Sequence, residues 1–230
     1  MTDTPYSLEK SILRQQSYGV LSTHSTEVPG YPFGSVTSYS LDQDGLPILF
    51  LSDTALHSQN IKADAKICLT ILETDTGNIQ AKARLSLPGY AFHIDKHLPA
   101  AKRYFRYFPA HKDFINSSFS FYKLKLSAAY LVGGFAKTAW VDPDQLAGPN
   151  PFFGEAEIEF SEWAMTDHQE TLQKWCRQYK QIEIPDHVLL YVAGLDSSGF
   201  DVLVGELKLR FPFLTFAYSL DEAKLAFETL

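Results

Sequence analysis

The residues best suited to bind an anionic ligand lie in the segment 52–60, which reads Ser-Asp-Thr-Ala-Leu-His-Ser-Gln-Asn. This segment follows a predicted strand and opens a short predicted helix, so free backbone amides and the helix dipole would favour a phosphate there. An ordinary Ser/Thr helix cap beside a surface histidine is the alternative. The candidate ligand contacts are the polar side chains of this segment: Ser52, Thr54, His57, Ser58 and Asn60.

The cations near this segment decide how well it could hold a phosphate. A phosphate monoester carries nearly two negative charges at neutral pH, and Arg or Lys neutralises them better than His does. The segment offers His57, so phosphate binding would depend on Lys62, Lys66 or Arg84 reaching the same place. Arg84 lies on a predicted strand, where its guanidinium could bind a phosphate or carboxylate through two hydrogen bonds. It could equally pair with an acid such as Asp53.

Several other chemistries have no support in the sequence. No His, Cys or carboxylate residues recur at zinc-site spacing, and neither a Gly-x-Ser-x-Gly motif nor a P-loop is present. We therefore expect no metal site of this kind and no hydrolase chemistry. The aromatic and basic residues of 102–108 alternate at helical spacing, which favours a core face with a solvated basic face over a base-stacking surface.

Composition indicates a folded intracellular protein. The chain has 230 residues with 45% hydrophobic and 20% charged residues, and its formal charge of -7 argues against binding a nucleic acid. The first ten residues lack the basic and apolar regions of a signal peptide, and no segment approaches the ~20 apolar residues of a membrane span. We expect a cytoplasmic protein without membrane contact, in which Cys68 and Cys176 are buried, reduced thiols and form no disulfide.

The positioning elements begin with a short helix over 7–17, capped by Ser7. Strand patterns follow at 18–23, 33–41, 46–52 and 66–72. A longer alternating segment spans 78–94, with a bend or bulge expected at Pro88 and Gly89. A helix is predicted over 98–108 and two more strands within 119–141. Six curved antiparallel strands are most economically closed as a barrel.

A stretch rich in proline and glycine at 142–157 marks a domain boundary. We predict a barrel domain over 1–147 and a smaller domain over 148–230. The smaller domain would contain a helix from its N-cap Ser161 to Tyr179, two strands at 187–196 and 200–211, and a last helix over 219–230. Ser219 and Glu222 have the spacing of a capping box at the start of that helix.

Three segments of the sequence carry a resemblance to a known family: GYPFGSVTSYSLDQDGLPILFLSDTALHSQNIKADAKICLTI, ARLSLPG and GGFAKTAWV. They resemble the pyridoxamine 5'-phosphate oxidase-like FMN-binding split barrels, in the HugZ-like haem-utilisation branch. Residues 148–230 resemble the αββα module that follows this barrel, with Met165, Asp167 and His168 at its His-Met-Asn-x-Asp-His motif. The resemblance implies an α+β fold with a six-stranded antiparallel split barrel, flanking helices and a small α/β module. It also implies a homodimer with a cofactor pocket at the dimer seam.

The same resemblance implies FMN as the cofactor and a flavin-dependent oxidoreductase as the function. In such proteins the strand equivalent to Gly34, Ser35, Val36 and Thr37 runs along the isoalloxazine ring, and the residue equivalent to Trp140 lies against the ring system. A glycine in this strand would permit close approach of the ligand. The alternatives are a strand with solvent-facing hydroxyls and an ordinary core or interface tryptophan. No catalytic residue is identified.

Haem binding or haem breakdown is an alternative function for the same fold, and a cofactor-free interaction module is a third. Haem iron is most often held by a neutral His. In the HugZ-like branch the ligand is associated with the carboxy-terminal region, and this chain has no histidine after His187. His168, beside Asp167, is therefore the candidate ligand if haem binds. A structural hydrogen bond within this pair is the alternative.

Overall fold

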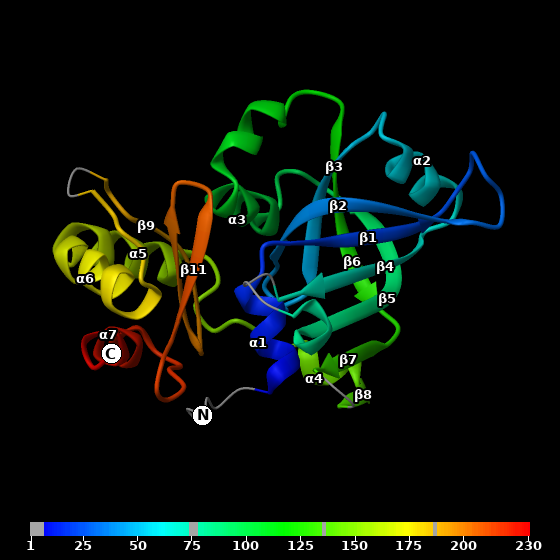
Figure 1. The fold of residues 1–230 in the computed structure, drawn as a ribbon. Helices are drawn as coiled ribbons and strands as arrows, with labels where there is room; N and C mark the ends of the chain where they lie inside the picture. The colour runs from blue at the N-terminus through cyan, green and yellow to red at the C-terminus, as the bar shows by residue number, and fades with distance from the viewer. Residues whose placement is uncertain (1–6, 74–77, 135–136, 186–187) are drawn as a thin grey trace. The chain divides into compact units, whose positions relative to one another are not determined.

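The computed structural model describes residues 7–73, 78–134, 137–185 and 188–230 (Figure 1). They form two compact units, one of residues 7–149 and the other of residues 150–230. The first unit is built on a β-barrel and the second on a three-stranded sheet with helices. None of the described helices is both long and apolar enough to span a membrane.

The barrel of the first unit is closed and entirely antiparallel, as predicted. Its strands follow the order β4-β1-β2-β3-β6-β5, and pairing between β4 and β5 closes the ring. Two further strands extend the sheet from β5. The strands are β1 (Tyr18–His24), β2 (Pro32–Leu41), β3 (Pro47–Ser52), β4 (Lys66–Leu72), β5 (Ala83–Ile94), β6 (Phe119–Leu126), β7 (Ala129–Gly133) and β8 (Thr138–Val141).

The segment 119–141 therefore holds three strands where the sequence predicts two. The first break lies at Ser127 and Ala128, whose backbone amides both donate to the Pro88 carbonyl. The second follows Gly133, where Gly134 has a φ of +95°, a conformation that glycine adopts readily. Next to this first break, β5 changes its partner on the edge opposite β4. It pairs with β7 up to Ser86 and with β6 from Gly89 onward.

Gly89 lies at a close approach between the backbones of β5 and β6. A Cβ at this position would lie 2.2 Å from the carbonyl oxygen of Lys125 in β6, so the backbone approach requires glycine. The register between β4 and β5 runs without interruption from Arg84 to Tyr90. Pro88 and Gly89 therefore mark the change of strand partner, and the predicted bend contains no bulge.

Leucine side chains fill the barrel interior, including Leu21, Leu49, Leu69 and Leu85, all fully buried. β1 and β4 alternate between such inward residues and outward, more exposed ones, as a barrel wall requires, whereas β3 is buried on both faces. Four helices accompany the barrel: α1 (Leu8–Gln15), α2 (Leu56–Ala63), α3 (Pro99–Tyr107) and α4 (Pro143–Leu146). Arg103 of α3 is buried and donates to the Leu41 carbonyl, so the basic face of this helix is not wholly solvated.

The second unit differs from the predicted αββα arrangement in two places. The helix predicted over 161–179 is two helices that meet at His168, and Ser161 lies buried inside the first, where its hydroxyl donates to the Val192 carbonyl. The strand predicted over 200–211 is a hairpin turning at Gly205, whose φ is +61°. Ser219 caps the last helix, as predicted. The elements are α5 (Glu155–Asp167), α6 (Gln169–Lys180), β9 (Tyr191–Asp196), β10 (Gly199–Val204), β11 (Leu207–Pro212) and α7 (Leu220–Glu228).

Candidate functional site

The start of α2 lies against β2 and forms a polar corner, which we define as Ser35, His57 and Ser58. The Ser35 hydroxyl lies 3.3 Å from Nδ1 of His57. Burial lowers the pKa of His57 from its ordinary value, so its ring is neutral at neutral pH. Nε2 of His57 and the hydroxyl of Ser58 are buried and have no hydrogen-bond partner among the described residues. Such unsatisfied buried atoms are uncommon, and they make this corner a candidate for a polar ligand.

The cations that the sequence places near this corner are held elsewhere. Nζ of Lys62 lies 4.0 Å from the Asp53 carboxylate and donates to the Asp53 carbonyl. Arg84 lies on the outer wall of the barrel, between buried Ala83 and Leu85, and pairs in register with strands β4 and β7. The corner therefore presents a neutral histidine at the place where a phosphate would need a positive charge.

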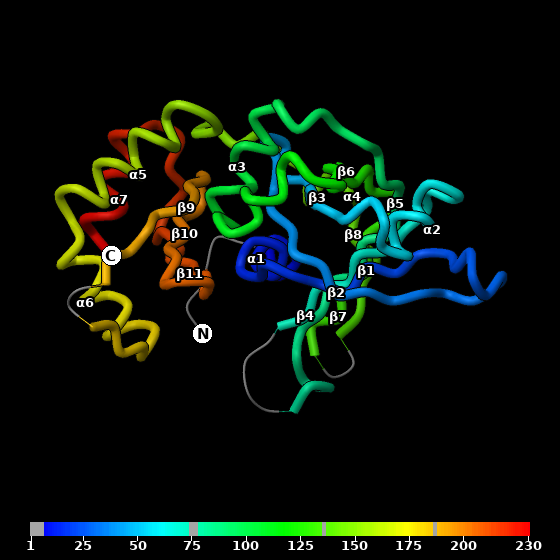
Figure 2. The backbone as a smooth tube through the Cα atoms, turned by 90° about the horizontal axis from the view of Figure 1, so that it is seen from above, coloured from blue at the N-terminus to red at the C-terminus, as the bar shows by residue number. Residues whose placement is uncertain are grey.

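Three other predicted ligand contacts have partners within the protein. The hydroxyls of Ser52 and Thr54 lie 3.1 Å apart. Asn60 is fully buried, and its side-chain oxygen accepts from both the backbone amide and the hydroxyl of Thr26. Its amide nitrogen donates to the hydroxyl of Thr23. Asn60 thus fastens the loop between β1 and β2, a hairpin that extends past α2 (Figure 2).

The candidate residues on β2 divide between the two faces of the barrel wall, because successive strand residues point to opposite sides. Ser35 and Thr37 point inward, whereas Gly34 and Val36 point outward. A Cβ at Gly34 would make only an ordinary 3.7 Å contact with Val20, so this glycine is not required by close packing. The sequence therefore brings Ser35 to the polar corner and leaves Val36 on the outside.

Val36 belongs to a row of outward residues that crosses six strands in register. We call this set the outer row. Its two ends, Val36 and Trp140, are 74% and 71% exposed. Trp140 packs against Tyr130, with ring centroids 4.9 Å apart. The outer row consists of Val36, Val20, Thr70, Ser86, Tyr130 and Trp140.

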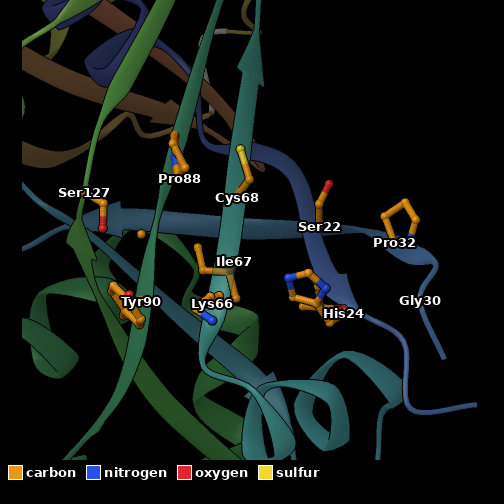
Figure 3. A pocket seen from close by; sticks show the side chains of 12 residues that line it. Ser22, His24, Gly30, Pro32, Lys66, Ile67, Cys68, Pro88, Tyr90 and Ser127 are labelled. Atoms are coloured by element: carbon orange, nitrogen blue, oxygen red, sulfur yellow. The ribbon is translucent and has the colours of Figure 1, made fainter.

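A pocket of about 470 Å³ opens on the same outer wall, two residues further along the strands (Figure 3). We call it the wall pocket. Ser22, Cys68 and Pro88 lie opposite one another on β1, β4 and β5 and form one row of its lining. His24, Lys66 and Tyr90 follow as the next outward row. The remaining lining residues are Thr23, Gly30, Pro32, Ile67, Gly89 and Ser127.

Sequence reasoning missed this pocket, although part of the signal was available. Alternation within 18–24 and 66–72 predicts that Ser22, His24, Lys66 and Cys68 all point outward. Cys68 was expected to be a buried thiol, but it is half-buried because it lines the pocket. The missing information was the pairing of β1 with β4, which brings these four side chains together.

His168 lies in the second unit, at the junction of α5 and α6. Its ring centroid is 4.3 Å from that of Trp163 and 5.1 Å from that of Phe227, so the imidazole packs among aromatic rings. Over the described ranges, no three His, Cys, Asp or Glu side chains gather as a metal site. Cys68 and Cys176 are free thiols, as predicted.

Comparison with known proteins supports the barrel. Residues 7–147 match the family model described as CREG, beta-barrel. A curated protein of Arabidopsis thaliana, "Non-canonical heme oxygenase HOZ, chloroplastic", is 31% identical over 223 residues. The match covers 89% of this chain and 65% of that protein, so the chain spans slightly less than two thirds of this relative.

Solved structures share the fold. The protein Atu2129 (unknown function) from Agrobacterium tumefaciens str. C58 has a TM-score of 0.78 at 21% identity, covering 97% of this chain and 93% of its own. A heme binding protein from Mycobacterium smegmatis has a TM-score of 0.57 at 24% identity, covering 96% of this chain and 93% of its own. At these identities the similarity shows a common fold.

Proposed function

The chain belongs to the CREG β-barrel family through residues 7–147, and from this premise we propose that it binds haem and acts in haem turnover. Two facts support the proposal. The Arabidopsis relative that matches 89% of this chain is named as a heme oxygenase. The wall pocket brings a histidine next to apolar side chains, and this is the observation that carries the proposal.

The wall pocket combines apolar lining with an imidazole. Pro32, Pro88 and Tyr90 supply apolar surface, and His24 lies at one end beside Lys66 (Figure 3). A volume of about 470 Å³ is within the usual range for small-molecule sites. Haem is most often held by one neutral histidine beside an apolar slot, so His24 would hold the iron. Bound haem would supply the redox chemistry, while the protein binds and orients it.

We further propose that the protein is a homodimer joined through the outer row. Large exposed apolar side chains can form an interaction surface, and the two ends of the outer row, Val36 and Trp140, are exposed while the residues between them are half-buried. The wall pocket adjoins this row, so a second barrel packed there would flank the pocket. Trp140→Glu should therefore convert a dimer to a monomer in analytical ultracentrifugation. Leu225→Glu, at an exposed position of α7, is the matched control and should leave the dimer intact.

A haem titration followed at the Soret band tests the function. The wild-type chain should bind one haem, and His24→Ala should shift the Soret band and weaken binding. His97→Ala removes an exposed histidine outside the pocket and should behave as wild type. Absence of haem binding by the wild-type protein would refute the proposal. A spectral change on His168→Ala, with none on His24→Ala, would refute His24 as the iron ligand.

FMN binding at the polar corner is the second candidate, favoured by the unsatisfied atoms of His57 and Ser58 at the start of α2. Backbone amides at a helix start can hold a phosphate, but the corner lacks a cation. His57→Arg should therefore raise FMN affinity about tenfold or more, since a hydrogen bond to a charged group contributes about 1.5–3 kcal/mol. Quenching of flavin fluorescence measures the affinity. If neither the wild-type protein nor His57→Arg quenches the fluorescence of added FMN, FMN binding at the polar corner is excluded.

A further inference from the structure

We propose that Lys66 binds a carboxylate of the ligand in the wall pocket, which makes the pocket specific for planar molecules that carry carboxylates at one edge. The inference rests on the proposed function, because haem is such a molecule, and it adds the residue that selects the ligand. It follows from the arrangement of charge and apolar surface in the pocket.

The two rows of the pocket differ in chemistry. The row of Ser22, Cys68 and Pro88 forms one end, while His24 and Lys66 lie together at the other (Figure 3). Cross-strand neighbours on one face of an antiparallel sheet are about 5 Å apart. The ammonium group of Lys66 thus stands at the edge of a surface formed by small and apolar side chains.

Lys66 is available to a ligand. Its side chain is 61% exposed, and Nζ lies 3.9 Å from the carboxylate of Asp64, which is also exposed. A largely exposed ion pair at this distance contributes little to stability, so a carboxylate held in the pocket could replace Asp64. The Asp64 carboxylate keeps a second role without Lys66 Nζ, since it accepts a hydrogen bond from the Lys66 backbone amide.

Aromatic and apolar surface next to this ammonium favours a flat ligand. Tyr90 pairs with Lys66 across β4 and β5, and its ring lies 6.4 Å from that of Phe92, centroid to centroid. Both rings are exposed. Pro88 continues the apolar lining within the pocket, and Ile67 borders the pocket from the barrel core. A small inorganic anion would contact only the ammonium group of Lys66, whereas a planar amphiphile would contact both the ammonium group and the apolar surface beside it.

The test compares ligands that differ in carboxylates or in iron. Haem, haem dimethyl ester and iron-free protoporphyrin IX are titrated against the wild-type chain, Lys66→Gln and the control Lys62→Gln. Lys62 is a similarly exposed lysine that does not line the pocket. Wild type and Lys62→Gln should bind haem about tenfold more tightly than the dimethyl ester. Lys66→Gln should lose about tenfold in affinity for haem and protoporphyrin, with little change for the ester.

The outcomes separate this inference from the proposed function. Equal affinities of the wild type for haem and its ester, or an unchanged affinity in Lys66→Gln, would overturn the role of Lys66 while leaving haem binding in place. Lys66-dependent binding of protoporphyrin without binding of haem would support the carboxylate site and refute the proposed function. A wild-type chain that binds none of the three ligands would overturn both.

Discussion

Replacing Asn60 by Ala should destabilise the barrel unit and loosen the loop between β1 and β2. The side chain of Asn60 is fully buried and makes hydrogen bonds to the amide and hydroxyl of Thr26 and to the hydroxyl of Thr23. Each such bond contributes about 1 kcal/mol on average, and an unsatisfied buried group costs about 1–3 kcal/mol. The free energy of unfolding should therefore fall by about 2–4 kcal/mol, as measured by urea denaturation.

The matched control for this prediction is Gln59→Ala. Gln59 is the preceding residue of α2 and is exposed, and among the bonds described its side chain donates only to the Thr54 carbonyl. Gln59→Ala should therefore lower the free energy of unfolding by less than about 1 kcal/mol. The two variants remove similar amide side chains from the same helix. Equal unfolding free energies for Asn60→Ala and Gln59→Ala would refute the conclusion that Asn60 is an anchor of the loop.

Three further predictions follow from burial and backbone geometry. Gly89→Ala should lower the free energy of unfolding by several kcal/mol, because the added Cβ would lie 2.2 Å from a carbonyl oxygen of β6. A Cβ at Gly148 would meet no atom within 4 Å, so the control Gly148→Ala should leave the free energy of unfolding nearly unchanged. Urea denaturation measures both. Burial lowers the pKa of His57 below 6.5, so as the pH falls this histidine is protonated in the unfolded chain before it is protonated in the folded one. The free energy of unfolding should therefore decrease as the pH drops below about 6.5. His57→Gln should make this decrease smaller in unfolding experiments at several pH values. Burial raises the pKa of Cys176 to about 11, so Cys68, half-buried in the wall pocket, should react with a thiol reagent first, as peptide mapping would show. Faster labelling of Cys176 would contradict this order.

The sequence predicts the barrel because wall strands such as β4 carry one apolar face. The alternation in 66–72 identifies that strand and its inward face, and burial follows it, whereas β3 is buried on both faces. The second unit shows where pattern reasoning fails. No glycine or proline marks the helix break at His168, although Thr166, Asp167 and His168 are weaker helix formers than the residues that flank them. Gly205, by contrast, carried a readable signal, because a Gly-Glu pair between Val204 and Leu207 forms a two-residue hairpin loop.

The candidate site was harder to predict than the fold because it depends on register between strands distant in sequence. Leu21, Leu69 and Leu87 lie opposite one another inside the barrel, and burial of each leucine contributes about 1.5–3 kcal/mol. A slip of β4 by one residue would turn Leu69 outward, away from Leu21 and Leu87, and direct Lys66 into the interior. The energy of the leucine core thus also fixes Lys66 beside His24 on the outer wall. The position of the wall pocket is therefore a consequence of how the core packs, and core variants that keep the register should keep the pocket.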